Sequence, residues 1–478
     1  MSGVDFRLRP FIARPPRAPW LVAALAGAAA PLPFSGEAGV DVCIIGGGFS
    51  GLWTALRLRE QDAALSIAVL EADRCGTGAS GRNSGAAGHW WTRLPLLLKC
   101  LGREGALAVI AASEAAVEDI HGFVAQHGIA CEARFERSVW AATAPGRPGA
   151  WGPMFRAAEA AGVTPPQRPV PAEELRALYG DAPYFAGVME ERATRLDPAA
   201  LARGLRRVAL AQGIAVHEGS AVTRLASADG HVLVETRGGR IRAQQVVLAA
   251  NAWMAQLAPF RDEVMVLSSD MVATDAIPQV LAARGLAGRP GGTNSRMMLN
   301  YGGVTPAGQV YLGRGAGVLG FGARIGVGMH HAPRQLRELA ADFRHLYPEL
   351  HDQALPHGWG GPIDRSTTGM PQFGTLAADP RIHYAIGYTG HGVGATALCG
   401  RVLASAVLGK RDRWYEIGAL LGRVRNGRYP PEPLRYLAAS VVQAAVRRKE
   451  IAERDGRKPS RLDVKLAPWA LATLPARR

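Results

Sequence analysis

Apolar and polar positions near the start of the chain follow a strand–helix–strand order. Residues 40–45 form a short apolar run between glycines, which predicts a buried parallel strand. Residues 52–59 carry apolar side chains at helical spacing, and residues 66–70 form a second apolar run. Together these segments predict a β-α-β unit over residues 40–71.

Later segments repeat the alternation at longer intervals. Asp197 and Pro198 are typical of the first residues of a helix, which we expect to run to residue 212. Short alternating strands are expected to follow it. The other predicted elements are a helix at 104–128, a strand at 245–249, a strand at 382–386 and a helix at 395–408.

This order predicts an α/β protein in which a second domain interrupts a Rossmann-like dinucleotide-binding domain. We expect a mixed-sheet α+β substrate domain and a basic C-terminal helical extension. The predicted boundaries are 1–35 for an N-terminal strap, 36–92, 195–259 and 360–410 for the dinucleotide-binding domain, 93–194 and 260–359 for the substrate domain, and 411–478 for the extension.

A G-x-G-x-x-G motif joins the first predicted strand to its helix. Gly46 allows the tight turn, Gly48 lets a pyrophosphate approach the backbone, and Gly51 lets the helix pack on the strand. The helix N-terminus adds free N–H groups for the anion. Glu71 ends the second strand, about 20 positions later, where a carboxylate suits the ribose of an adenine nucleotide.

Two further glycine motifs differ in their context. Gly315, Gly317 and Gly320 match the same pattern, but later glycines prevent a regular helix, so we expect a turn region. Residues 390–394 lie between a predicted strand and a predicted helix. Their helix N-terminus is a second candidate for facing the negative charge of a cofactor.

Composition and charge narrow the class of protein. The chain has 478 residues, of which 48% are hydrophobic, so a large core is expected. The net charge is +15, but no basic stripe is interleaved with aromatic residues, so we expect no nucleic-acid partner. The odd number of cysteines forms no CxxC pair, which fits a reducing, cytoplasmic location and predicts no metal site: Cys43, Cys75, Cys100, Cys131 and Cys399.

The two ends of the chain each leave an alternative open. Residues 20–30 resemble a short export signal, but prolines crowd the segment before them, and we favour a strap that packs on the first domain. From residue 434 onward an apolar stripe precedes Arg447, Arg448 and Lys449, which predicts a basic amphipathic helix. We expect this helix to dock on its own protein; the alternative is weak contact with a membrane surface or a partner.

Three motifs together resemble one family of enzymes. They are VDVCIIGGGFSGLWTALRLRE from residue 40, VLEADRCGTGASGRNSG from residue 69 and IGYTGHGVGATALCG from residue 386. They are similar to the FAD-dependent amine and amino-acid oxidoreductases, the group of D-amino-acid oxidase, glycine oxidase and sarcosine oxidase. The GASGRNSG and HGWGGPID runs resemble gamma-glutamylputrescine oxidase and its relatives. The resemblance covers about residues 36–410.

The resemblance implies a noncovalently bound FAD, because no cysteine lies in the segment where some relatives attach flavin. His357 is the remaining candidate for attachment. Residues 249–253 would close over the FAD. Its other expected binding residues are Gly46, Gly48, Ser50, Gly51, Glu71, Ser80, Arg82, Asn83, Ser84, Val222, Gly387, Gly390 and Gly392.

For the substrate side, the sequence suggests aromatic residues to enclose an alkylamine and an arginine to clamp a carboxylate. The catalytic candidates are Trp359, Tyr388 and His391. The other substrate-side candidates are Tyr301, His89, Trp90, Arg296 and Arg365. No general base is expected, because hydride transfer from a neutral amine needs none.

The predicted function is oxidation of a C–N bond in an amine or amino acid by hydride transfer to flavin N5. The imine is then hydrolysed, and electrons pass to O2 or another acceptor. Three alternatives stay open: a quinone-linked amino-acid dehydrogenase at a membrane surface, a non-catalytic FAD-binding protein and an NAD-dependent enzyme.

Overall fold

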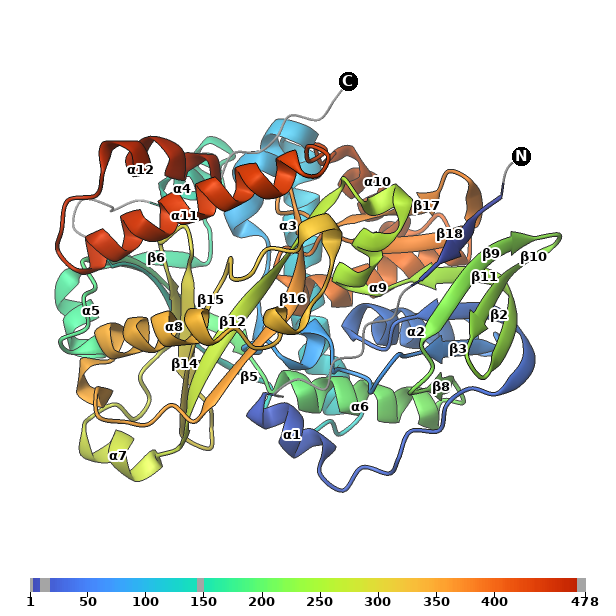
Figure 1. The fold of residues 1–478 in the computed structure, drawn as a ribbon, viewed down its shortest axis with the longest axis horizontal. Coiled ribbons are helices and arrows are strands. Elements are labelled where there is room, and N and C mark those ends of the chain that lie inside the picture. The colour runs from blue at the N-terminus through green and yellow to red at the C-terminus, as the bar shows by residue number, and fades with distance from the viewer. Residues whose placement is uncertain (1–2, 9–17, 144–149, 471–478) are drawn as a thin grey trace.

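The computed structural model describes residues 3–8, 18–143 and 150–470. It contains two nine-stranded sheets that lie side by side, with helices packed around them (Figure 1). The two sheets divide the strands as the interrupted-domain prediction requires, because each sheet takes strands from separate parts of the chain. The fold is the α/β architecture predicted from the sequence.

The first sheet carries the dinucleotide-binding topology. Parallel strands β8, β3, β2, β11 and β18 lie next to one another in this order. Strand β10 pairs antiparallel with the first half of β11, and β9 and then β1 continue the sheet from there. Its strands are β1 (Asp5–Arg7), β2 (Gly36–Ile45), β3 (Ile67–Leu70), β8 (Ala215–His217), β9 (Val222–Ala228), β10 (His231–Thr236), β11 (Gly239–Leu248), β17 (Gln372–Leu376) and β18 (Asp379–Ile386).

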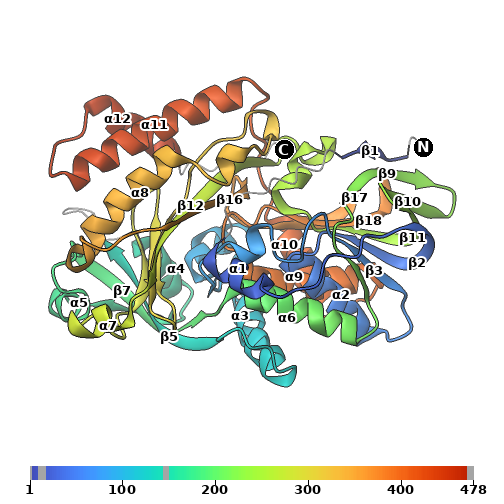
Figure 2. The ribbon, with the colours of Figure 1, turned by 60° about the horizontal axis from the view of Figure 1, so that its bottom comes forward.

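The second sheet is mixed and forms the other lobe (Figure 2). Its order is β16-β12-β15-β14-β13-β5-β7-β4, and β6 pairs with β7. The strands are β4 (Ala86–Ala87), β5 (Arg134–Ala142), β6 (Gln167–Val170), β7 (Ala186–Arg195), β12 (Val264–Ala276), β13 (Gly291–Asn294), β14 (Asn300–Val304), β15 (Gln309–Arg314) and β16 (His357–Ser366).

Helices cover the sheets and their junction. The cluster of buried residues on the first sheet joins apolar side chains of α2, α3, α6 and α9. The helices are α1 (Pro19–Leu25), α2 (Phe49–Gln61), α3 (Leu94–Gln126), α4 (Gly152–Ala160), α5 (Ala172–Tyr179), α6 (Pro198–Ala211), α7 (Pro278–Ala283), α8 (Pro333–Leu346), α9 (Gly392–Val407), α10 (Arg413–Arg423), α11 (Leu434–Arg454) and α12 (Arg461–Leu466). As predicted, Asp197 caps α6, and its carboxylate accepts from the N–H groups of Ala199 and Ala200.

In two places packing or strand pairing continues across a predicted domain boundary. Helix α3, assigned to the substrate domain, packs against α9 and shares the core of the dinucleotide-binding domain, because its Val109, Ile110 and Ile120 need an apolar face to cover. The boundary between residues 359 and 360 falls inside β16, which pairs with β12 along its whole length. The glycines of β16 allow close approach of neighbouring residues and do not end the strand.

The predicted strap enters the fold at two points. Strand β1 pairs with β9, and α1 packs against α6. Trp20 of α1 lies edge-on to Trp359 of β16, with ring centroids 4.9 Å apart. The first turn of α1 therefore covers part of the junction between the two sheets.

Candidate active site

A cavity of about 420 Å³ lies between the two lobes and takes its walls from both sheets. One end is bordered by Glu71 and Val222, near the carboxyl ends of the parallel strands. The other end is bordered by His89 and Tyr301, where the second sheet begins. Ligands of open α/β sheets bind at this edge of the parallel strands, so the cavity is the candidate active site.

Three glycines shape the wall where α2 begins. Gly46 has φ +115°, and a Cβ there would lie 2.5 Å from the carbonyl oxygen of Ala249. A Cβ on Gly48 would lie 2.9 Å from Ser80 Oγ, and one on Gly51 would lie 1.9 Å from the carbonyl oxygen of Gly46. Gly46 and Gly51 therefore permit the turn and the packing of α2, and both Gly46 and Gly48 border the cavity.

The N-terminus of α2 faces the cavity. Gly48 is its N-cap and supplies no side chain, while the N–H of Phe49 donates to Ser80 Oγ over 2.9 Å. The first turn of a helix carries a partial positive charge. This turn, with Ser80 beside it, can therefore bind a pyrophosphate.

Glu71 lies in the cavity wall at the end of β3. Its carboxylate accepts from the N–H of Gly47 over 2.7 Å and from the N–H of Asp73 over 3.0 Å. Burial raises its pKa to about 7, although the two N–H donors act in the opposite direction. The hydrogen bonds fix the carboxyl group at the end of β3, where ribose hydroxyls can reach it.

Asp364 organises the opposite wall, below the turn that precedes α9. It is fully buried, and its carboxylate accepts from the N–H of Gly387 over 2.5 Å and from Asn251 Nδ2 over 3.2 Å. Its carbonyl oxygen accepts from the N–H of Thr389, which has φ +54°. Burial raises the pKa of Asp364 to about 7. Thr389 is β-branched, so this backbone conformation is strained and is held by the surrounding hydrogen bonds.

Tyr388 and His391 occupy the same turn but make different contacts. Tyr388 accepts a hydrogen bond from Ser50 Oγ over 2.7 Å and is buried. His391 borders the cavity at the N-terminus of α9, and its Nδ1 lies 3.0 Å from the carbonyl oxygen of Thr389. The ring of His391 is exposed to the cavity, and the protein that surrounds it, followed by the nearby Arg93, lowers its pKa to about 4.

The end of the cavity at His89 and Tyr301 has a polar and an aromatic wall. His89 Nε2 lies 3.0 Å from Glu190 Oε1, and Gln167 donates to the other oxygen of Glu190 over 2.7 Å. Tyr301 exchanges a hydrogen bond with Ser269 over 2.8 Å. The Tyr301 ring lies flat on Gly313, its neighbour across the strands, where a Cβ would come within 2.1 Å of it.

Most predicted site residues border this cavity. They are Gly46, Gly48, Ser50, Glu71, Ser80, Arg82, Asn83, Ser84, Val222, Tyr388, Gly390, His391 and Gly392. Gly51 and Gly387 lie next to the wall without lining it; Gly387 has φ +88° and donates to Asp364. Among the substrate-side candidates, His89 and Tyr301 also line it.

The structure places four other candidates elsewhere. Trp359 shares a face of β16 with Gly361 and Ile363 but lies further along the strand, where Trp20 covers it and its Nε1 donates to the carbonyl oxygen of Arg82. The remaining three do not line the cavity either: Trp90 is buried in the core, Arg296 pairs with Asp342, and Arg365 donates to the carbonyl oxygen of Ala470. His357 pairs with Asp275 on the outside of the sheet.

Several residues of the wall were not predicted as site residues. Asp364 lies in the HGWGGPID run, and its place shortly after these glycines is the signal that could have found it. Thr389 carries no sequence signal, because its strained backbone appears only in the fold. Ser269, Thr293 and Leu299 come from strands and loops of the second sheet whose register the sequence did not predict.

Fold and cavity together are those of a dinucleotide-binding protein with a second sheet that borders the same cavity. The sequence profile of the family described as "FAD dependent oxidoreductase" matches residues 41–406. The chain therefore belongs to this family. It is an FAD-dependent enzyme, and the NAD-dependent alternative is not supported.

Curated relatives match over most of their length. The chain is 27% identical to gamma-glutamylputrescine oxidoreductase of Escherichia coli over 384 residues, which covers 78% of this chain and 85% of that protein. It is 25% identical to probable oxidoreductase OrdL of Haemophilus influenzae over 383 residues, which covers 78% of this chain and 84% of that protein.

A solved structure shares the fold. Glycine oxidase from Geobacillus kaustophilus superposes with a TM-score of 0.63 at 19% identity, covering 78% of this chain and 96% of that one. Within residues 3–8, 18–143 and 150–470, no helix has the length and hydropathy to cross a bilayer, and no cluster of His, Cys, Asp and Glu is arranged to hold a metal ion.

The residues of the cavity fit FAD. Gly46 and Gly51, where a side chain would collide with backbone atoms, lie at the N-terminus of α2. The carboxylate of Glu71 lies about 20 positions further along the chain, as the motif requires. Asn251 Oδ1 is buried in the opposite wall without a hydrogen-bond partner in the protein, so it can accept from a bound group. Gly46, Gly48, Ser80 and Glu71 would hold the adenosine diphosphate half, and the turn at 387–392 the flavin half.

Proposed function

We propose that this FAD-dependent oxidoreductase oxidises the C–N bond of an amine, gives an imine that water hydrolyses, and passes the electrons to O2. The observation that carries the proposal is one continuous cavity. It joins the glycine-rich wall of α2 to the part bordered by His89 and Tyr301. A cofactor and a small substrate can therefore lie in one space.

FAD bound in this cavity would supply the hydride acceptor. The chain itself contributes binding, orientation and exclusion of water. The N-terminus of α9 directs its N–H groups and its dipole toward the cavity, which favours negative charge on a group bound there. His391 and His330 both line the cavity with pKa values lowered to about 4, His330 by its burial and His391 by the protein that surrounds its exposed ring, so both are neutral near pH 7.

The charges at the end of the cavity near His89 and Tyr301 favour an amine over an α-amino acid as substrate. Of the described residues that line the cavity, Arg82 alone is an arginine or lysine, and its guanidinium donates to the carbonyl oxygens of Thr77 and Gly360. Arg296 and Arg365, the predicted carboxylate clamps, lie outside the cavity. The carboxylate of Glu190 stands behind His89 and favours a cationic group. The amine named for the Escherichia coli relative agrees with this choice.

Matched substrate pairs test the proposal. Purified protein is mixed without oxygen with alkylamines and with α-amino acids of the same chain length, and the visible absorbance of the flavin is followed. We expect the amines to bleach the flavin and the amino acids to do so far more slowly. Bleaching by the amino acids alone would reject the amine assignment, and no bleaching by any of them would reject the catalytic proposal.

The electron acceptor is tested separately. Oxygen uptake with peroxide formation is the result we expect for the amine-reduced protein. If reduced protein is stable in air but is reoxidised by a quinone or a dye, the protein is a dehydrogenase instead.

A further inference from the structure

Helix α11 lies beyond residue 406, where the family match ends, yet it crosses the second sheet beside α8 (Figure 1). We propose that α11 positions the substrate end of the cavity, with Gln443 and Glu450 as positioning residues. The proposal rests on the proposed function, since it concerns the pocket for the amine.

Two segments form the part of the substrate end that α11 contacts. Leu299 and Gly315 both line the cavity, and the N–H of Gly315 donates to the carbonyl oxygen of Leu299 over 3.1 Å. Residues 294–299 and 315–318 are therefore joined to each other. A shift of either segment changes the wall that borders the substrate.

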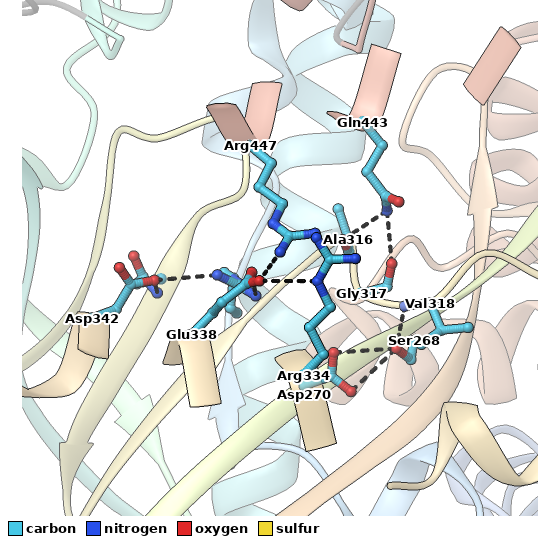
Figure 3. Close-up of polar contacts among 12 residues, drawn as sticks. Ser268, Asp270, Ala316, Gly317, Val318, Arg334, Glu338, Asp342, Gln443 and Arg447 are labelled. Carbon is cyan, nitrogen blue, oxygen red and sulfur yellow. Dashed lines mark hydrogen bonds and ion pairs between the residues drawn. The ribbon is translucent and has the colours of Figure 1, made fainter. Parts of the chain in front are cut away.

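Gln443 holds the second segment from above. Its Nε2 donates to the carbonyl oxygens of Ala316 and Gly317, over 2.9 and 2.7 Å (Figure 3). Ala316 has φ +61°, a conformation that costs free energy for a residue with a Cβ and persists only where neighbours hold it. The Gln443 amide is one such neighbour, because it engages two successive carbonyl groups of the strained turn.

Strand β12 holds the same segment from below. Ser268 Oγ accepts from the N–H of Val318 over 2.7 Å and donates to Asp270, which is buried (Figure 3). A Cβ on Gly317 would lie 2.1 Å from Asp270 Oδ2 and 2.2 Å from Ser268 Oγ. The turn is thus packed closely between β12 and α11, and Gln443 supplies the upper contact.

Glu450 holds the first segment, two turns further along α11. It is buried, and its Oε1 accepts from the N–H groups of Met297 and Met298, over 2.7 and 3.3 Å. Hydrogen bonds to a charged acceptor contribute more than neutral ones. Met298, Val446 and Ala467 pack together beneath them, so this contact is partly apolar.

Ion pairs with α8 fix α11 over both segments. Glu338 pairs with Arg447 of α11 (Figure 3). It also pairs with Arg314 at the end of β15. Asp342 pairs with Arg454 of α11, with Arg314 and with Arg296. Arg296 lies within residues 294–299, and Arg314 directly precedes residues 315–318. Glu338 and Asp342 therefore orient both the helix and the two wall segments.

The test compares four variants for flavin reduction by an amine. Gln443→Ala leaves two backbone carbonyl groups without their donor, and Glu450→Ala leaves two backbone N–H groups without their acceptor. Each is expected to raise the half-saturating amine concentration about tenfold and to change the limiting rate little. Glu450→Gln keeps an acceptor oxygen and is expected to restore most of the affinity. Leu437→Ala, on the exposed side of the same helix, is the control and should match the wild type.

Amide hydrogen exchange gives a readout that needs no substrate. Both alanine variants should exchange faster in peptides covering 294–300 and 313–319, with unchanged exchange in α2. Unchanged half-saturation and unchanged exchange in both would overturn the proposal. If an alanine variant fails to fold, Gln443→Glu, which sets an acceptor against two carbonyl oxygens, provides the same comparison. If no amine reduces the wild-type flavin, the proposed function fails, and hydrogen exchange alone decides this inference.

Discussion

Ser50 Oγ donates to the Tyr388 hydroxyl over 2.7 Å, although the two residues are 338 positions apart. Ser50 lies in the first turn of α2, and Tyr388 lies in the turn before α9. The bond therefore joins the two helix N-termini that face the cavity. It makes a single wall of the segments expected to hold the two halves of FAD.

Tyr388→Phe should loosen this wall. The variant leaves the buried Ser50 hydroxyl without its acceptor, which costs about 1 kcal/mol, or roughly a fivefold weaker binding of FAD if the cofactor depends on the wall. Flavin content after dialysis, measured against protein absorbance, checks the change. Tyr384→Phe, a half-buried residue on β18 outside the cavity, is the control. Equal flavin retention by Tyr388→Phe and the control would contradict the role of the bond.

Glu71→Ala should weaken FAD binding about tenfold. The substitution removes the acceptor of two backbone N–H groups and the carboxylate proposed to bind the ribose. Titration of the FAD-free protein with FAD measures the dissociation constant. Glu60→Ala, an exposed residue of α2, is the matched control. A Glu71→Ala protein that retains its full flavin would remove the ribose role.

Asp364 should make stability depend on pH. Burial raises its pKa from 3.8 to about 7, so between these values the folded protein holds a proton that the unfolded chain has released. The free energy of unfolding therefore falls as the pH rises from about 4 to about 7. Asp364→Asn removes this titration and keeps an acceptor for the N–H of Gly387.

Thermal unfolding of the FAD-loaded proteins at about pH 5 and about pH 8 measures the difference. The wild type should lose more melting temperature between the two conditions than Asp364→Asn does. Parallel losses in the two proteins would show that Asp364 is ionised throughout or protonated throughout.

His391 should not titrate during turnover near neutral pH. Its ring is exposed to the cavity, but the surrounding protein and then Arg93 lower its pKa to about 4, so it is neutral above about pH 5. His391→Gln should therefore leave the shape of the pH profile of anaerobic flavin reduction unchanged between about pH 5.5 and pH 8. An inflection present in the wild type and missing from the variant would show that His391 ionises in this range.

The sequence predicted the parts of the site that local patterns specify. The order of strand, glycine turn, helix and acid around Gly46 and Glu71 is set within about 30 residues, and the structure reproduces it. The turn at Gly390 was predicted for the same reason. In both places the glycines mark backbone conformations or close contacts that residues with a side chain rarely adopt.

The second sheet was predicted only in outline, because its contacts are long-range. The HGWGGPID run was noted for its family resemblance. It forms most of β16, where Gly360 makes room for Asp270 and Met329. Trp359 was expected at the substrate, and the register of β16 with β12 places it under Trp20 instead.

The C-terminal helix shows a similar limit. Its apolar stripe predicted a docked face, yet Leu434, Leu437 and Val441 are more than half exposed. The helix docks through Val446, which packs with Met298 and Ala467, and through the polar residues Gln443, Arg447 and Glu450, whose partners lie on other elements. Periodicity locates apolar residues, but it does not identify which hydrogen bonds and ion pairs the rest of the fold will provide.

The most direct test is a single anaerobic turnover with a primary amine. The purified protein is mixed with the amine, the visible flavin band is followed, and the carbonyl product is counted against the flavin reduced. The account predicts a yellow protein whose band bleaches as one carbonyl product forms per flavin. A colourless protein that takes up no FAD, or a flavin that no amine or amino acid bleaches, would contradict it.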